Sequence, residues 1–195
     1  MWLCPLRVAQ RVLTLQKLNS VMKTNALSVA NYFIELAQRD NKPIQLLGLV
    51  KRVYIAHGFA LAMLHRGLTD PRFDKVEAWK YGPVIPSVYH SFKCYRAQPI
   101  TEKTVVMEWN DETKAPVFVA PEVKDKQDRQ IIEMVWKRYQ NYTDNQLVDL
   151  THQKSTPWDL CFVEGKNVEI PDELTEYYYR RIVDYYASKI KANEQ

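Results

Sequence analysis

The chain has 195 residues, of which 46% are hydrophobic and 26% charged, a composition typical of a globular domain with a real core and not of a disordered chain. Its five glycines argue against a Gly-rich phosphate loop and against an all-β fold full of tight turns. Three of its four net positive charges come from residues 1–21, which contain Arg7, Arg11 and Lys17 and no acid. The remainder is nearly neutral, so the charge is poor support for nucleic-acid binding.

Residues 1–21 are interpreted as an N-terminal extension to a single domain at residues 22–195, and Met22 is a candidate for the natural start. Basic residues interrupt the extension, so it lacks a signal-peptide core; the alternative is a short amphipathic helix that touches a partner or a membrane. No run approaches the roughly 18 apolar residues that span a bilayer, so no membrane association is expected of the domain. The three cysteines are too few and too scattered for a disulfide framework, which predicts a cytoplasmic location.

Two helices are predicted first along the chain. Apolar residues recur at three- and four-residue steps from Ala26 to Ala37, which indicates a helix capped by Asn25 or Ser28. A second apolar stripe covers residues 45–66, and Gly67 is expected to end that helix. Because the turn between them is short, the two helices should pack as an antiparallel hairpin.

The middle of the chain has a different hydrophobic pattern. Alternation over residues 76–81 predicts a short extended segment, which Gly82 and Pro86 end before a short helix at residues 88–95. Residues 100–123 indicate a small strand pair or an irregular excursion. Further helices are predicted at residues 124–142, at 144–152 with Gln146 in a capping box, and from Pro171 to about Ile190, with a loop around 156–158. The fold class is therefore mainly α, a compact bundle of about six helices with a small β element near residues 75–120.

The residues offer no catalytic or metal-binding constellation, so neither a metal nor a cofactor is expected. The four histidines form no HExxH pattern. His90 and Cys94 share a predicted helix face, but no oxyanion donor or orienting residue accompanies them, and a structural role is favoured for both. His57 lies on the apolar stripe of the second helix, which favours a hydrogen-bonded core histidine. His152 is expected to tie the loop that follows it to the domain by hydrogen bonds.

Residues 77–92, EAWKYGPVIPSVYHSF, concentrate aromatic and rigid residues. One interpretation is a plug that closes the end of the bundle. The other is a preorganised ledge for a protein partner, because rigid aromatic side chains lose little entropy on binding. Both hold if one side of the segment faces inward and the other outward. Glu77 is a candidate to form an ion pair with Lys51 or Lys80, and Gly82 is expected to supply a turn or a close approach.

Residues 46–95 resemble the Panacea-domain family, which includes GepA-like phage-associated proteins and SocA-like antitoxins. The resemblance rests on two motifs and extends to ALSVANYFIELA near the start and LTHQKSTPW near the end. Gly48, Val50 and Arg52 depart from the family pattern, which affects surface details of the second helix. The matching motif residues are Lys51, Tyr54, Ala56, His57 and Gly58, and then Glu77, Ala78, Trp79, Tyr81, Gly82, Pro83, Val84, Pro86, Val88, Tyr89, Phe92 and Lys93.

The resemblance implies an antitoxin that neutralises a cognate toxin by direct binding, either sterically or by handing the toxin to a protease. Two alternatives remain: a DNA-binding autoregulator of the same operon, and an enzyme that uses His90, Cys94 or His152. The most basic predicted helix mixes Lys and Arg with Asp and Glu, so nucleic acid is not the expected partner. The residues expected to bind the partner or carry the family signature are Lys51, Tyr54, His57, Glu77, Trp79, Tyr81, Gly82, Pro83, Pro86, Tyr89, His152 and Trp158.

Overall fold

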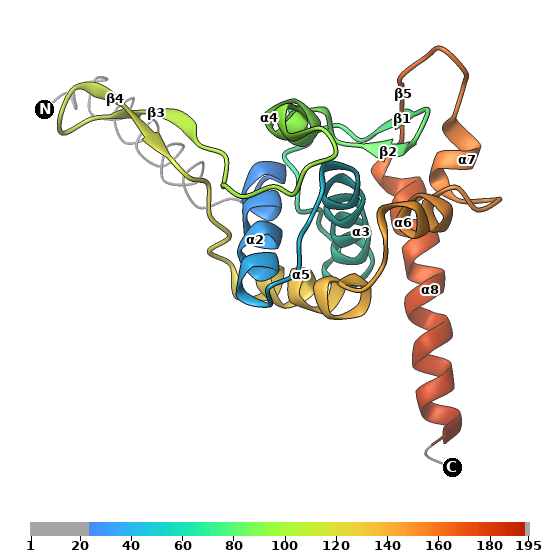
Figure 1. Ribbon diagram of the computed structural model, residues 1–195. Coiled ribbons are helices and arrows are strands. Elements are labelled where there is room, and N and C mark those ends of the chain that lie inside the picture. Colours follow the sequence, from blue (N-terminus) through green and yellow to red (C-terminus); the bar gives the residue numbers. More distant parts are fainter. Residues whose placement is uncertain (1–23, 194–195) are drawn as a thin grey trace, which may run out of the picture.

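The computed structural model describes residues 24–193, so the expectations for residues 1–21 lie outside the described residues. Helices α2 (Ala26–Arg39) and α3 (Leu46–Leu64) lie side by side as the expected hairpin (Figure 1). The predicted cap of α2 is confirmed. The Ser28 N–H donates to Asn25 Oδ1 at 2.9 Å and the Asn25 N–H donates to Ser28 Oγ at 3.0 Å, so each residue satisfies a backbone donor of the other.

Helix α3 is the axis of the fold. It contacts α2, α4 (Pro86–Phe92), α5 (Lys126–Tyr139), α6 (Asp144–Thr151) and α8 (Asp172–Asn193). Contrary to the expectation from sequence, this helix is long and apolar enough by composition to cross a membrane, but 83% of it is buried inside the protein. Packing on several sides therefore accounts for its apolar character.

The β structure forms two separate antiparallel sheets. Strands β1 (Glu77–Trp79), β2 (Gly82–Val84) and β5 (Val168–Glu169) make one sheet in the order β2-β1-β5. Strand β5 lies outside the expected range of residues 75–120, because two residues are too short for a sequence pattern to reveal. Strands β3 (Val106–Asn110) and β4 (Ala115–Val119) form the second sheet, a hairpin that projects from the bundle (Figure 1).

The predicted helices are present, with shifted ends and one addition. The described residues contain seven α-helices and the 3₁₀ turn η1 (Lys93–Tyr95). Helix α7 (Pro157–Cys161) replaces the expected loop because Thr156 caps it and Pro157 starts it. Helix α3 ends before Gly67, since His65 takes the left-handed conformation at φ 54. Gly67 instead makes room for the His57 ring, whose Cε1 would lie 2.5 Å from an added Cβ.

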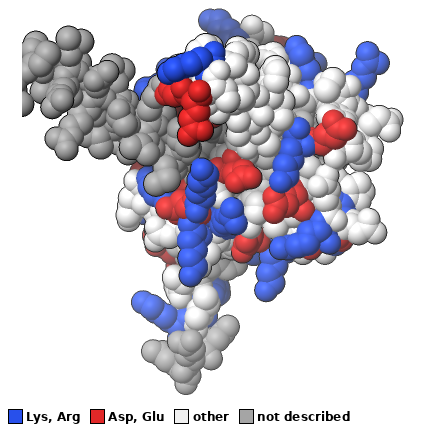
Figure 2. Space-filling model, turned by 90° about the vertical axis from the view of Figure 1, so that its left-hand side faces the viewer, with Lys and Arg blue, Asp and Glu red and all other residues white. Residues whose placement is uncertain are grey.

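Charges of both signs are mixed over the surface. Figure 2 views the side from which β3 and β4 project, and on this face Lys and Arg are interspersed with Asp and Glu. A wide uncharged area occupies the upper part of the same view. The described residues visible on this face therefore form no continuous basic surface of the kind that a nucleic-acid backbone requires.

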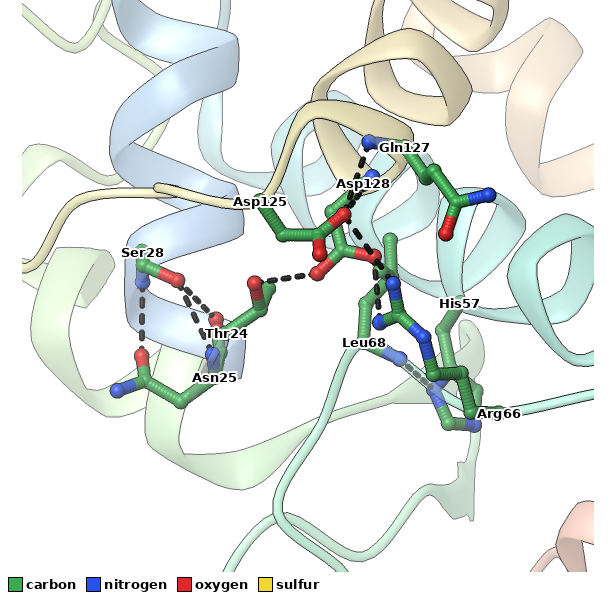
Figure 3. A network of polar contacts seen from close by, with 9 residues as sticks. All are labelled: Thr24, Asn25, Ser28, His57, Arg66, Leu68, Asp125, Gln127 and Asp128. Carbon is green, nitrogen blue, oxygen red and sulfur yellow. Dashed lines mark hydrogen bonds and ion pairs between the residues drawn. The ribbon is translucent and has the colours of Figure 1, made fainter. Parts of the chain in front are cut away.

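A buried polar clamp joins the starts of α2 and α5 to the chain that follows α3 (Figure 3). Arg66 pairs with Asp125 at 3.2 Å and with Asp128 at 2.6 Å, and Asp128 also accepts a hydrogen bond from the Thr24 hydroxyl. Asp128 is almost fully buried. Removing one partner would leave an uncompensated buried charge, so this clamp fixes how the three helices meet.

Candidate functional site

Three distant parts of the family signature meet at a buried junction formed by Lys51 of α3, Gly82 and Pro83 of β2, and His152 and Trp158 of the C-terminal region. Lys51 is fully buried, and its Nζ donates to the Pro83 carbonyl at 3.1 Å. Gly82 has φ 99, and a Cβ there would lie 2.6 Å from Lys51 Nζ and 3.0 Å from His152 Nε2. Glycine is therefore required both by the backbone conformation and by the close approach of these two side chains.

The junction disfavours positive charge. Burial lowers the pKa of Lys51 to about 7, so part of the population is neutral at neutral pH. Burial also lowers the pKa of His152, the nearby Lys51 charge lowers it further, and the Tyr81 carbonyl opposes the shift. Both groups therefore resist protonation for the same physical reason, which is loss of solvation.

His152 contacts the C-terminal region mainly by stacking, in addition to the hydrogen bond with the Tyr81 backbone. Its ring lies parallel to that of Trp158 with centroids 3.7 Å apart. The Trp158 indole N–H donates to the Trp79 carbonyl at 2.8 Å. The region containing α6 and α7 is thus locked onto β1 through one tryptophan.

Tyr54 and His57 face α8 and hold it against α3. The His57 Nδ1 accepts from the Leu68 N–H at 3.3 Å, which leaves Nε2 to donate to Asp172 Oδ1 at 2.9 Å. The expectation of a hydrogen-bonded core histidine is confirmed. Tyr54 meets the Tyr179 ring edge-on at 6.0 Å, and burial raises its pKa. The sequence prediction missed Asp172, although an acid in the first turn of a helix was a usable signal.

The segment of residues 77–92 has an inward and an outward side. Its aliphatic residues are buried, while Trp79 and Tyr89 are half-buried and meet edge-on at 5.0 Å. Pro86 starts α4. Glu77 forms neither of the ion pairs considered from sequence; its carboxylate accepts from the Trp79 indole N–H at 2.7 Å. Tyr81, at the turn, is 63% exposed.

A groove of about 410 Å³, here called the motif groove, opens beside Tyr81. Its apolar lining comes from the start of α3 and from the signature segment, and Lys80, Arg96 and Asn167 complete it. This arrangement suits apolar side chains of a partner with acidic neighbours. The sequence prediction missed the lining residues outside the motif, and of its own candidates only three line the groove. The apolar lining residues are Leu46, Leu47, Val50, Trp79, Tyr81, Val84 and Tyr89.

Arg52, expected to alter the surface of the second helix, is buried instead. Its guanidinium donates to the carbonyls of Tyr139 at 2.9 Å and Tyr142 at 3.1 Å, and it lies 5.7 Å from the Trp136 ring centroid. A cation at the end of a helix satisfies carbonyls that have no partner within the helix. Arg52 therefore joins α3 to the end of α5.

Comparison with known proteins places these features in a family. The family model described as "Antitoxin SocA-like, Panacea domain" matches residues 49–159, a range that contains Lys51, the β1–β2 turn, His152 and Trp158. Antitoxin SocA of Caulobacter vibrioides is 31% identical over 136 residues, which are 70% of this chain and 69% of that protein. The chain belongs to the SocA-like, Panacea-domain antitoxin family. No solved structure matches it.

Membership in the SocA-like family suggests a non-enzymatic role and bears on the remaining histidine and cysteine candidates. His90 and Cys94 are both exposed on α4 and η1, and the His90 ring lies against those of Tyr89 and Trp79 at 5.4 and 6.3 Å. Residues 24–193 contain no cluster of three or more His, Cys, Asp or Glu side chains that could hold a metal ion. The arrangement of His90 is that of an aromatic contact at the surface.

Proposed function

We propose that this protein neutralises a cognate toxin by binding it directly, and that the motif groove is part of the binding surface. The observation that carries the proposal is Tyr81, a large ring that lies exposed beside an apolar groove at the β1–β2 turn. Exposed apolar surface next to a formed groove is typical of protein interaction sites.

The geometry favours binding with little reorganisation. Lys51 donates a hydrogen bond to the Pro83 carbonyl, and the Trp158 indole N–H donates one to the β1 backbone. An aromatic residue presented on such a support loses little conformational entropy when a partner covers it. A buried tyrosine at the centre of an interface commonly contributes about 2 kcal/mol or more to the binding free energy. Binding is also the step shared by steric neutralisation and delivery to a protease, and both routes would take place in the cytoplasm.

The test is co-expression with the product of the adjacent reading frame. That product should harm cells when expressed alone, and it should copurify with this protein. Tyr81→Ala should keep the wild-type melting temperature within about 2 °C and weaken binding about tenfold or more. Tyr177→Ala is a matched control, because Tyr177 is also 63% exposed but lies on α8.

Trp79→Ala separates a residue that stabilises the fold from one that contacts the toxin. Because Trp79 is half-buried and packed on Tyr89, its loss should cost about 2–3 kcal/mol of unfolding free energy. If the adjacent product is harmless and does not copurify, the proposal fails. If Tyr81→Ala binds as tightly as wild type, the toxin lies elsewhere on the surface.

A further inference from the structure

The β3–β4 hairpin presents an apolar face that nothing among the described residues covers. Met107 lies directly opposite Phe118, and Trp109 directly opposite Pro116, and directly opposed residues of an antiparallel pair share one face. The three large side chains Met107, Trp109 and Phe118 are 67%, 58% and 75% exposed. A two-stranded hairpin is marginally stable in water by itself, so apolar side chains gathered on its outer face mark a contact surface.

The hairpin is a built element and not a loose excursion. At its base the Asn31 side chain of α2 is almost fully buried, and its Nδ2 donates to the carbonyls of Thr104 at 3.0 Å and Pro121 at 3.1 Å. Its Oδ1 accepts from the Thr104 N–H at 2.9 Å. At the tip, Asn110 Oδ1 accepts from the N–H groups of Glu112 and Thr113. One side chain therefore ties both arms of the hairpin to the bundle and fixes how its face is presented.

The charge around this face selects the kind of partner. Residues 101–123 carry five acidic residues and two lysines, in a chain whose net charge is +4. Lys103 is already paired with Glu35 at 2.7 Å. A second copy would set acids against acids, and phosphate groups of a nucleic acid or an anionic membrane would be repelled in the same way. A basic protein surface is attracted.

The chain's own N-terminal residues are basic as well, so they are a competing occupant. The hairpin lies inside residues 49–159, the range matched to the family model, whereas residues 1–23 lie outside that range. A face that belongs to the family's domain is better explained by a partner that the domain binds than by a segment outside the match.

We infer that the apolar face of the β3–β4 hairpin docks a partner protein that presents an apolar patch within a basic rim. The inference rests on the proposed function in taking this partner to be the toxin. The hairpin face and the motif groove are built from different elements, so they act as separate contact surfaces.

The test is site-specific photocrosslinking with p-benzoylphenylalanine in place of Phe118, in cells of the source organism that express the full chain. The matched control carries the same amino acid in place of Phe73, which is 77% exposed but precedes β1. The hairpin variant should crosslink one basic protein at least about tenfold more than the control does. Glu112→Lys, at the tip of the hairpin, should reduce that crosslink several-fold. Added salt should reduce it as well, because surface electrostatic attraction is screened.

Three outcomes would overturn the inference: no crosslink above the control, a crosslink to a second copy, or a crosslink to residues 1–23 of the same chain. A basic partner that crosslinks at the hairpin but proves harmless to cells supports the hairpin surface and removes the toxin assignment. A toxin that is neutralised and copurifies, yet gives no crosslink at the hairpin, keeps the proposed function and refutes the hairpin surface.

Discussion

Replacing Lys51 by Met tests whether burial lowers the pKa of the Lys51 side chain, and so makes the stability of the protein depend on pH. Lys51 is fully buried, and burial lowers its pKa from the ordinary value of 10.5 to about 7. Between these two values the unfolded chain holds a proton on Lys51 that the folded chain has released. Because the unfolded state binds more protons, the stability of the wild-type protein should rise with pH across this window.

The magnitude follows from the depressed pKa. Each pH unit within the window contributes about 1.4 kcal/mol, and allowing for partial protonation near pH 7 the change between pH 7 and 9.5 is about 3 kcal/mol. Lys51→Met lacks this contribution. It also leaves the Pro83 carbonyl without its donor, which costs about 1–3 kcal/mol at every pH. The pH dependence of the difference is therefore the diagnostic quantity.

Urea unfolding followed by tryptophan fluorescence, at several pH values from 7 to 9.5, measures this difference. The wild type should gain about 3 kcal/mol relative to Lys51→Met over the range. Lys154→Met, a change at an exposed lysine, is the control and should show no such trend. A difference between wild type and Lys51→Met that stays constant within about 0.5 kcal/mol would refute the argument that burial lowers the pKa.

Three further substitutions test single contacts. Gly82→Ala should lower the free energy of unfolding by about 2–4 kcal/mol in urea, through backbone strain and steric overlap. Gly165→Ala, also at positive φ but with open space around it, should cost only about 1 kcal/mol. Equal losses would contradict the close approach of Lys51 and His152 to Gly82. Asn31→Ala should speed hydrogen exchange of the β3–β4 amides about tenfold or more, and unchanged exchange would mean that the hairpin is held by something else. Asp128→Asn should cost about 2 kcal/mol in thermal unfolding because the Arg66 pair loses its charge; an unchanged melting temperature would show that the clamp contributes nothing.

Local sequence pattern was sufficient for most of the helices and for the caps of α2 and α6, but not for α7 or for the end of α3. The apolar spacing of α2 and the reciprocal pairing of Asn25 with Ser28 depend only on neighbours in sequence, and the structure confirms them. The same holds for the Thr143–Gln146 capping box at the start of α6. Strand β5 escaped prediction because its two residues owe their conformation to pairing with β1, which is remote in sequence.

In the candidate site, too, the sequence identified the residues but not their contacts with remote parts of the chain. The family resemblance identified Lys51, Trp79, Gly82, His152 and Trp158 as a set, but no local pattern states that a lysine on an apolar helix lies beneath a glycine in a distant turn. The polar partner of Glu77 was also misjudged: its carboxylate accepts from the nearby Trp79 indole and not from a cation. Which polar group pairs with which depends on burial, and sequence spacing does not determine burial.

The sequence by itself determined a mainly helical fold and membership in an antitoxin family. The apolar periodicity indicates the helices, and the motif at residues 77–92 identifies the family. The tertiary structure alone decided which face of that segment is exposed, which residues line the motif groove, and that residues 101–123 form a projecting hairpin with an apolar face. These features arise where elements remote in the chain meet. Their side chains are buried or left exposed by packing, and packing is a property of the whole fold.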